Sequence, residues 1–249
     1  MLFLLRKIRN KMIKESKFGQ YLLYAIGEII LVVVGILIAV QIDNWNETIR
    51  EKSIEQRTLT ELKLAIMQDT SSYNKTIRYG GIKLESTKRL ARALNNGIED
   101  YDSIRIDLVN SNFTYFFSFN SGPYETFKSI GLDKISNDSI RNSITYIYGK
   151  LLPDTETYFN EIARELIQKN RQIFEKNVLT VTVLKDNDWS HFNYEWHSDE
   201  FITKKELSTF VSNQVYITKG YISRISFIVE ELEALLLLLD SNLPEEDNI

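Results

Sequence analysis

Both histidines of the chain lie in one short stretch, HFNYEWHSDE, at residues 191–200. On an extended strand alternate side chains share a face, so His191, Glu195 and His197 would point the same way. Two imidazoles and one carboxylate are a ligand set that suits zinc. One hypothesis is therefore a metal-dependent hydrolase; solvated polar side chains around packed aromatics are the simpler explanation of the same stretch.

A second candidate is Glu28, the one formal charge between residues 21 and 42. At about 100° of rotation per helical residue, Glu28, Gly35 and Ala39 fall close to one line. Small residues let two helices approach closely, and a carboxyl among apolar groups needs a partner. Two interpretations stay open: a proton relay, or a carboxyl that holds packed helices together.

The 22 residues from 21 to 42 predict a transmembrane helix. With a rise of about 1.5 Å per residue they span roughly 33 Å, enough for a hydrocarbon core of about 30 Å. Tyr21 and Tyr24 at one end and Trp45 at the other lie where interfacial aromatic anchors are expected. The run is longer than the core of a signal peptide and no small-x-small cleavage pattern follows it, so we expect an uncleaved anchor in the lipid bilayer.

Charges on the two flanks predict the orientation. The short segment before the apolar run is basic, which places the N-terminus in the cytoplasm and residues 43–249 on the other side of the membrane. Its bases are Arg6, Lys7, Arg9, Lys11, Lys14 and Lys17, against the single acid Glu15.

Composition excludes several classes of function. The net charge is −4 although the N-terminal segment is basic, so the rest of the chain is acidic, and this argues against a nucleic-acid partner. The absence of cysteine excludes disulfides and a cysteine nucleophile. Because no phosphate-loop, dinucleotide-binding, serine-elbow or zinc-protease motif occurs, we predict no catalytic residues and no cofactor.

The chain is predicted to be mainly α-helical, since it has only 3 prolines and 10 glycines. Apolar residues at helical spacing extend the transmembrane helix into a stalk as far as Gly80-Gly81, where we expect a kink or a turn. A further helix should stop at Asn95-Asn96-Gly97. We therefore expect a basic cytoplasmic segment at 1–20, the span at 21–42, the stalk and first helices at 43–96, and a helical periplasmic domain at 97–249.

That last domain should resemble a helical bundle. A short helix is expected from Pro123 to about Gly131, and another after the cap at 136–138. Pro153-Asp154 should break the chain before a helix at 155–176, and a long helix at 204–239 should pack back along the stalk. The alternating residues at 178–196 allow a small β-hairpin.

An aromatic cluster lies between these helices, in the irregular stretch before Pro123. Its members are Phe113, Tyr115, Phe116, Phe117 and Phe119. Buried core is the ordinary explanation, and an exposed docking surface or the pocket of a small-molecule sensor is the alternative.

Two stretches resemble a known family. YLLYAIGEIILVVVGILIAVQIDNWNE at 21–47, preceded by LRKIRNKMIKESKFGQ, and PYETFKSIGLDKISNDSIRNSITYIY at 123–148 are similar to an uncharacterised family of single-span inner-membrane proteins common in Bacteroidota, a domain of unknown function. Thr126-Phe127 and Ile130 depart from the usual acid-Leu and Ser. The resemblance implies a bacterial inner-membrane location and a mostly helical periplasmic domain, and it brings no catalytic residues.

We therefore expect a membrane-anchored periplasmic protein that acts in protein–protein association or signal reception. Its expected partners are lipid and either a second copy, forming a homo-oligomer, or another inner-membrane protein. Three rivals remain: a proton-coupled accessory subunit using Glu28, a periplasmic metal-dependent hydrolase using the histidines, and a small-molecule sensor.

Overall fold

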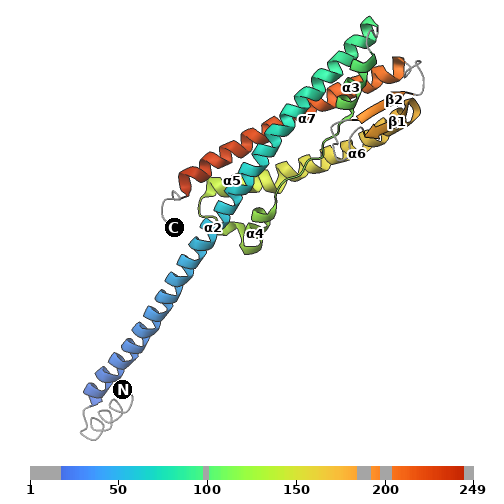
Figure 1. Cartoon of the computed structure of the whole chain (residues 1–249). Helices are drawn as coiled ribbons and strands as arrows, with labels where there is room; N and C mark the ends of the chain where they lie inside the picture. Colours follow the sequence, from blue (N-terminus) through green and yellow to red (C-terminus); the bar gives the residue numbers. More distant parts are fainter. Residues whose placement is uncertain (1–17, 98–100, 184–191, 197–203, 244–249) are drawn as a thin grey trace. The chain divides into compact units, whose positions relative to one another are not determined.

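The computed structural model describes residues 18–97, 101–183, 192–196 and 204–243, and it confirms a mainly helical chain (Figure 1). The long helices are α2 (Phe18–Asn96), α6 (Leu152–Asn177) and α7 (Lys204–Asn242). Shorter elements lie between them: α3 (Tyr101–Asn112), α4 (Gly122–Ile130), the 3₁₀ turn η1 (Leu132–Lys134), α5 (Asp138–Tyr146), the π turn η2 (Ile147–Leu151), β1 (Val178–Val183) and β2 (Phe192–Trp196).

The chain divides into two compact units, residues 1–56 and 57–249. In the first unit α2 carries the apolar run, and its large side chains are exposed; Leu23 and Leu31 are both 74% exposed. Within the described residues, α2 is one helix that is long and apolar enough to cross a membrane. A helix of this kind near an N-terminus is typical of a membrane span and of a signal sequence.

Helix α2 continues without interruption through Gly80-Gly81, so the predicted turn there is wrong. Gly80 has a different role, because a Cβ atom at this position would lie only 2.8 Å from Cγ1 of Ile222 in α7. The glycine permits close approach of the two helices. The predicted stop is confirmed: α2 ends at Asn96, and Gly97 follows with φ of 98° and donates its N–H to the carbonyl of Ala93 at 3.0 Å.

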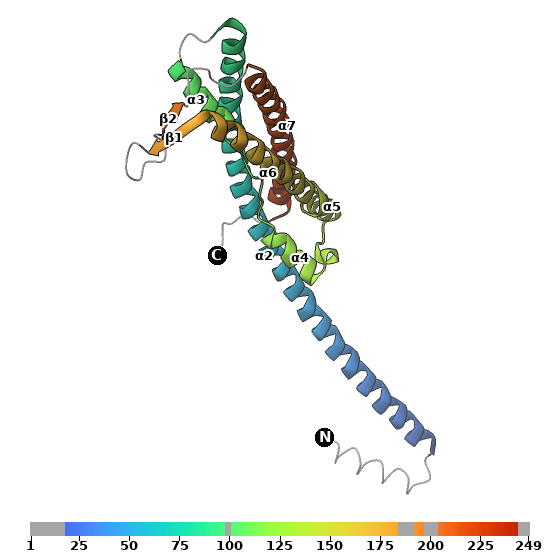
Figure 2. The same ribbon diagram turned by 90° about the vertical axis from the view of Figure 1, so that its right-hand side faces the viewer.

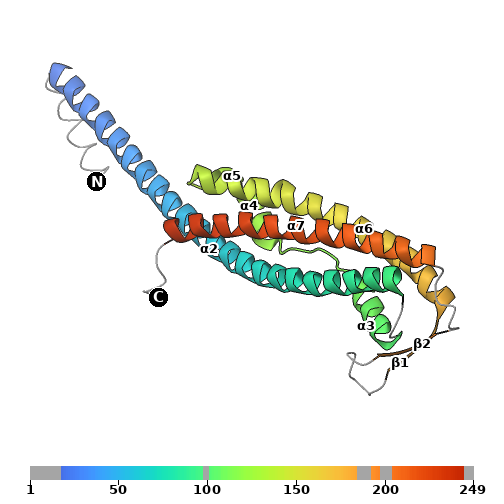
Figure 3. The same cartoon turned by 90° about the horizontal axis from the view of Figure 1, so that it is seen from above.

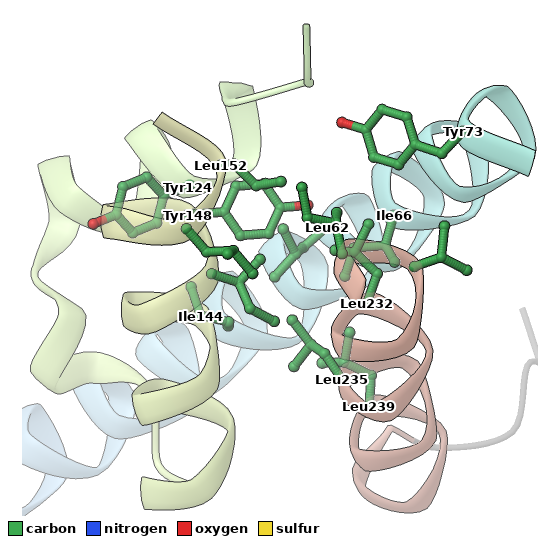
Figure 4. Close-up of a cluster of buried hydrophobic side chains, with 14 of the residues drawn as sticks. Leu62, Ile66, Tyr73, Tyr124, Ile144, Tyr148, Leu152, Leu232, Leu235 and Leu239 are labelled. Carbon is green, nitrogen blue, oxygen red and sulfur yellow. The ribbon is translucent and has the colours of Figure 1, made fainter. Parts of the chain in front are cut away.

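The second unit is held by a core to which α2, α4, α5, α6 and α7 all contribute (Figure 4). Helix α7 packs back along α2, as predicted, and Leu235 and Leu239 are buried in the same cluster as Leu62. An ion pair of 2.8 Å between Lys63 and Asp240 lies beside this contact. Figure 3 shows α7 between the second part of α2 and the pair α5–α6.

Pro153 does not break the chain, contrary to prediction, because α5 passes into α6 through the π turn η2. There the N–H of Leu152 reaches the carbonyl of Ile147, five residues back. In an ordinary α-helix a proline ring clashes with the carbonyl of the preceding turn. The wider π turn leaves room for the ring of Pro153 beside these carbonyls. The start of α5 is as predicted: the side chain of Asn137 accepts hydrogen bonds from Ser139 N and Ile140 N.

A two-stranded antiparallel hairpin follows α6, in the region where one was expected (Figure 2). The register pairs Val181 with Tyr194 and Val183 with Phe192, and an irregularity lies between Val178 and Thr180. The helix predicted from Pro123 to about Gly131 is α4, although the N-cap Ser121 makes no side-chain cap; Asn120 Oδ1 accepts from Gly122 N instead, at 3.0 Å.

The aromatic cluster is buried only in part. Phe117 is buried and stacks on Tyr73 with ring centroids 5.2 Å apart, whereas Phe113 and Phe116 are 61% and 53% exposed. The favoured explanation, buried core, is therefore correct for Phe117 and wrong for Phe113 and Phe116. The segment runs as extended chain with no helical or strand period, so only some of its side chains can face the helices.

Candidate binding site

The predicted metal ligands are not among the side chains that the structure describes. His191 and His197 lie outside the described residues, and Glu195 belongs to β2. Among the residues that are described, no group of three histidines or acids is placed to hold a metal ion. The metal site therefore stays a prediction.

The predicted helix-contact residues Glu28, Gly35 and Ala39 lie on α2. Glu28 is partly exposed and Ala39 exposed, and a Cβ atom on Gly35 would meet nothing within 4 Å. Trp45 is 64% exposed. Tyr21 and Tyr24 are helical residues of α2, and their role as interfacial anchors stays a prediction.

The most unusual described side chain is a buried lysine in the middle of the second unit. Lys83 of α2 is only 5% exposed. Its ammonium donates to the carbonyl oxygen of Phe113 at 2.5 Å, and within the described part of the chain this is its one hydrogen bond. An ammonium has three donors, and buried charges are normally paired with an opposite charge. Lys83 is therefore a buried cation whose charge no described carboxylate neutralises.

A polar contact between α2 and α3 places that carbonyl. The guanidinium of Arg89 donates hydrogen bonds to both carboxylate oxygens of Asp107, with nitrogen–oxygen distances from 2.6 to 3.1 Å. Nearby, the buried hydroxyls of Thr87 and Ser111 lie 3.1 Å apart. Two-point contacts of this kind fix both position and rotation. Since α3 ends at Asn112, its anchoring also fixes where the carbonyl of Phe113 meets Lys83.

Two cavities adjoin Lys83. The larger, of about 240 Å³, is lined by Lys83 with apolar, aromatic and amide side chains: Tyr79, Ile82, Val109, Asn110, Phe113 and Tyr115. Its mouth opens to solvent, because Tyr79, Ile82 and Phe113 are each about half exposed or more. The smaller, of about 30 Å³, lies deeper and is lined by Lys83, Tyr115, Thr218 and Tyr221 among others. We call the larger one the Lys83 cavity.

The electrostatics of the Lys83 cavity follow from burial. Loss of solvation lowers the pKa of Lys83 to about 8, so the ammonium is still largely protonated at neutral pH. Burial, and to a smaller extent neighbouring Tyr79, raises the pKa of Tyr115 to about 12. The phenol is therefore a neutral donor at neutral pH. The positive charge of Lys83 thus lines a space whose other walls are mostly apolar and aromatic, with the amide of Asn110 and the neutral phenol of Tyr115 among them.

Behind the small cavity lies a wider groove between α6 and α7, of about 780 Å³. The groove and the small cavity share Phe159, Ile162 and Ile217 as walls. Buried Thr218, whose hydroxyl has no hydrogen-bond partner in the described structure, faces the small cavity. The small cavity therefore shares walls with this groove and with the Lys83 cavity, and one buried hydroxyl without a partner faces it.

Sequence reasoning overlooked Lys83, although the sequence holds a signal for it. Buried positions of α2 recur every three or four residues, and this stripe passes through Tyr73, Gly80, Lys83, Thr87 and Leu90. A lysine in that register lies on the inner face of the helix. The neighbouring Ile82 lies outside this stripe and is 50% exposed.

Comparison with known proteins places the chain in a family. The model of the family of unknown function DUF6090 matches residues 28–194, so the chain belongs to this family. The match includes β1 and part of β2, beyond the two stretches on which the resemblance rested. No curated protein and no solved structure matches the chain.

Proposed function

We propose that the protein is anchored in a bacterial inner membrane by residues 21–42 and acts in protein–protein association or signal reception through a periplasmic helical domain. The observation that carries this proposal is the continuity of α2. One helix carries both the exposed apolar run and the buried Lys83 with its cavities. The apolar run and the Lys83 cavity therefore belong to one continuous helix.

The exposed apolar run supports the membrane part of the proposal. Ordinary soluble helices bury one face, but the side chains of this run are exposed on all sides of α2. The six bases before it support a cytoplasmic N-terminus. Glu28, Gly35 and Ala39 give the run one face with a polar group and small side chains, which suits contact with a second transmembrane helix.

Disulfide cross-linking in native membranes tests the association. The chain has no cysteine, so Gly35→Cys and Ala39→Cys each introduce a single reporter. The matched control is Leu37→Cys, which lies about 180° away around the helix. We expect a cross-linked homodimer, or a conjugate with another membrane protein, from Gly35 and Ala39 and little from Leu37. Equal yields at all three positions, or none, would contradict the proposal.

The same assay separates the two interpretations of Glu28. A proton relay predicts that Glu28→Gln abolishes function while the cross-link at Gly35 persists, whereas loss of the cross-link would favour a carboxyl that holds packed helices together. Protease accessibility from the cytoplasmic side tests the orientation. Cleavage within residues 60–240 in inverted vesicles, without detergent, would overturn the periplasmic placement.

A further inference from the structure

We infer that the Lys83 cavity is a binding site for a small monocarboxylate with a compact apolar body, of the size of benzoate. This inference rests on the proposed role in signal reception, for which it names the ligand. It is carried by the shape of the cavity, by the nature of its walls and by the single unneutralised cation at its base.

Charge determines the polar end of the ligand. Lys83 is buried, and its ammonium donates one hydrogen bond to a neutral carbonyl. Its other N–H groups remain available, and within the described residues no carboxylate neutralises its charge. A carboxylate placed in the cavity would supply that opposite charge and form a charge-assisted hydrogen bond. The charge of Lys83 therefore favours an anion.

Size and walls determine the rest of the ligand. A cavity of about 150 Å³ holds benzene, and drug-sized ligands occupy about 300 Å³ or more. The Lys83 cavity, at about 240 Å³, lies between these values. Rings of Phe113, Tyr79 and Tyr115 and the aliphatic Ile82 and Val109 form its sides. A single ring or a short branched chain fits this space, whereas a lipid tail or a peptide is too long.

Calorimetric titration of the full-length protein in detergent micelles tests the inference, with empty micelles as the blank. Three probes of similar size are compared: benzoate, its neutral isostere benzamide and the cation benzylamine. We expect benzoate to bind with a Kd of about 1 mM or below, and benzamide and benzylamine to bind at least about tenfold more weakly. No heat with benzoate, or benzamide as tight as benzoate, would overturn the inference.

Variants connect binding to the cavity. Lys83→Met keeps the aliphatic stem and removes the charge, and it should weaken benzoate binding by about tenfold or more. Lys88→Met, an exposed lysine on the same helix, is the matched control and should bind benzoate as the unaltered chain does. Unchanged affinity in Lys83→Met would place benzoate elsewhere and overturn the inference.

A second variant serves if Lys83→Met fails to fold. Phe113→Ala removes an exposed wall of the cavity and keeps the backbone carbonyl that Lys83 contacts. It should lower benzoate affinity several-fold, and an unchanged affinity would contradict the inference. Failure here is distinguishable from failure of the proposed function, because cross-linking at Gly35 does not depend on the ligand. Cross-linking at Gly35 without benzoate binding would support the proposed association and overturn the inference of a carboxylate site.

Discussion

The side chain of Asn160 is paired with both backbone groups of Phe117. Phe117 N donates to Asn160 Oδ1 at 2.8 Å, and Asn160 Nδ2 donates to Phe117 O at 2.9 Å. The side-chain amide of Asn160 thus makes the two hydrogen bonds that a neighbouring strand would make with Phe117 in a β-sheet. Through this pair, α6 holds the aromatic segment whose Phe113 carbonyl contacts Lys83.

Loss of this pair should destabilise the protein strongly. Asn160→Ala leaves an N–H and a carbonyl of buried Phe117 without partners, so we expect the free energy of unfolding to fall by about 3 kcal/mol. Denaturant unfolding of the full-length chain in detergent, followed by far-UV circular dichroism, measures the change. Asn142→Ala, at an exposed position of α5, is the control and should stay within about 0.5 kcal/mol of the unaltered chain. Equal stability of the two variants would refute the role of Asn160.

Two buried tyrosines of the same core should respond in opposite ways to loss of the hydroxyl. Tyr73 donates its hydroxyl to the carbonyl of Ser118 at 2.9 Å, whereas the hydroxyl of Tyr148 is buried without a partner in the described structure. Tyr73→Phe should therefore lower the free energy of unfolding by about 1 kcal/mol, and Tyr148→Phe should leave it unchanged or raise it. The two variants differ by one oxygen each, so each is the control for the other. A larger loss in Tyr148→Phe would show that its hydroxyl has a partner.

The depressed pKa of Lys83 predicts a rise in stability with pH. The pKa is about 8 in the folded chain and about 10.5 for an unperturbed lysine, so between these values the unfolded chain binds more protons. The free energy of unfolding therefore increases from pH 8 upward, by at most about 1.4 kcal/mol per pH unit. Below pH 8 both states hold the proton and this contribution is constant.

Above about pH 10 the trend should reverse. Burial raises the pKa of four core tyrosines, which therefore keep their protons in the folded chain after the unfolded chain has lost them. These residues are Tyr73, Tyr115, Tyr148 and Tyr221. Denaturant titrations at closely spaced pH values should show a maximum near pH 10. In Lys83→Met the rise between pH 8 and 10 should be absent; a rise that persists would belong to another group.

Much of the fold could be predicted because local signals and tertiary packing agree. The cap at Asn137, the left-handed Gly97 and the apolar stripe of α7 each act within a few residues, and each element lies where it was expected. The misses have tertiary causes. Pro153 is accommodated by a π turn, and Gly80 is required by Ile222, a residue far away in the sequence.

The candidate site was harder to predict than the helices. No motif identifies Lys83, because what distinguishes it is its burial and its hydrogen bond to the carbonyl of Phe113. That carbonyl belongs to a segment without regular secondary structure. The sequence did indicate a possible pocket beside the aromatic cluster, where the Lys83 cavity lies. It could not say which rings face inward, because an extended segment without alternation has no period from which to infer a face.

Gly80 and Gly81 provide a direct test of the contact between α2 and α7. Both are helical, so alanine at either position should gain about 1 kcal/mol of helix propensity. At Gly81 nothing lies within 4 Å of a new Cβ atom, and Gly81→Ala should be more stable than the unaltered chain. At Gly80 the new atom would lie 2.8 Å from Ile222 Cγ1. The steric cost should cancel or exceed the gain in helix propensity, so Gly80→Ala should be no more stable than the unaltered chain.

The double variant Gly80→Ala with Ile222→Ala decides whether Ile222 is the cause. Removing the ethyl end of Ile222 frees the space that the new methyl group needs, so the combined loss should be smaller than the sum of the single losses by about 1 kcal/mol or more. Denaturant unfolding of the four chains in detergent measures this coupling. Additive losses would mean that Gly80 is needed for another reason, and that α7 does not approach α2 at this point as closely as the structure has it.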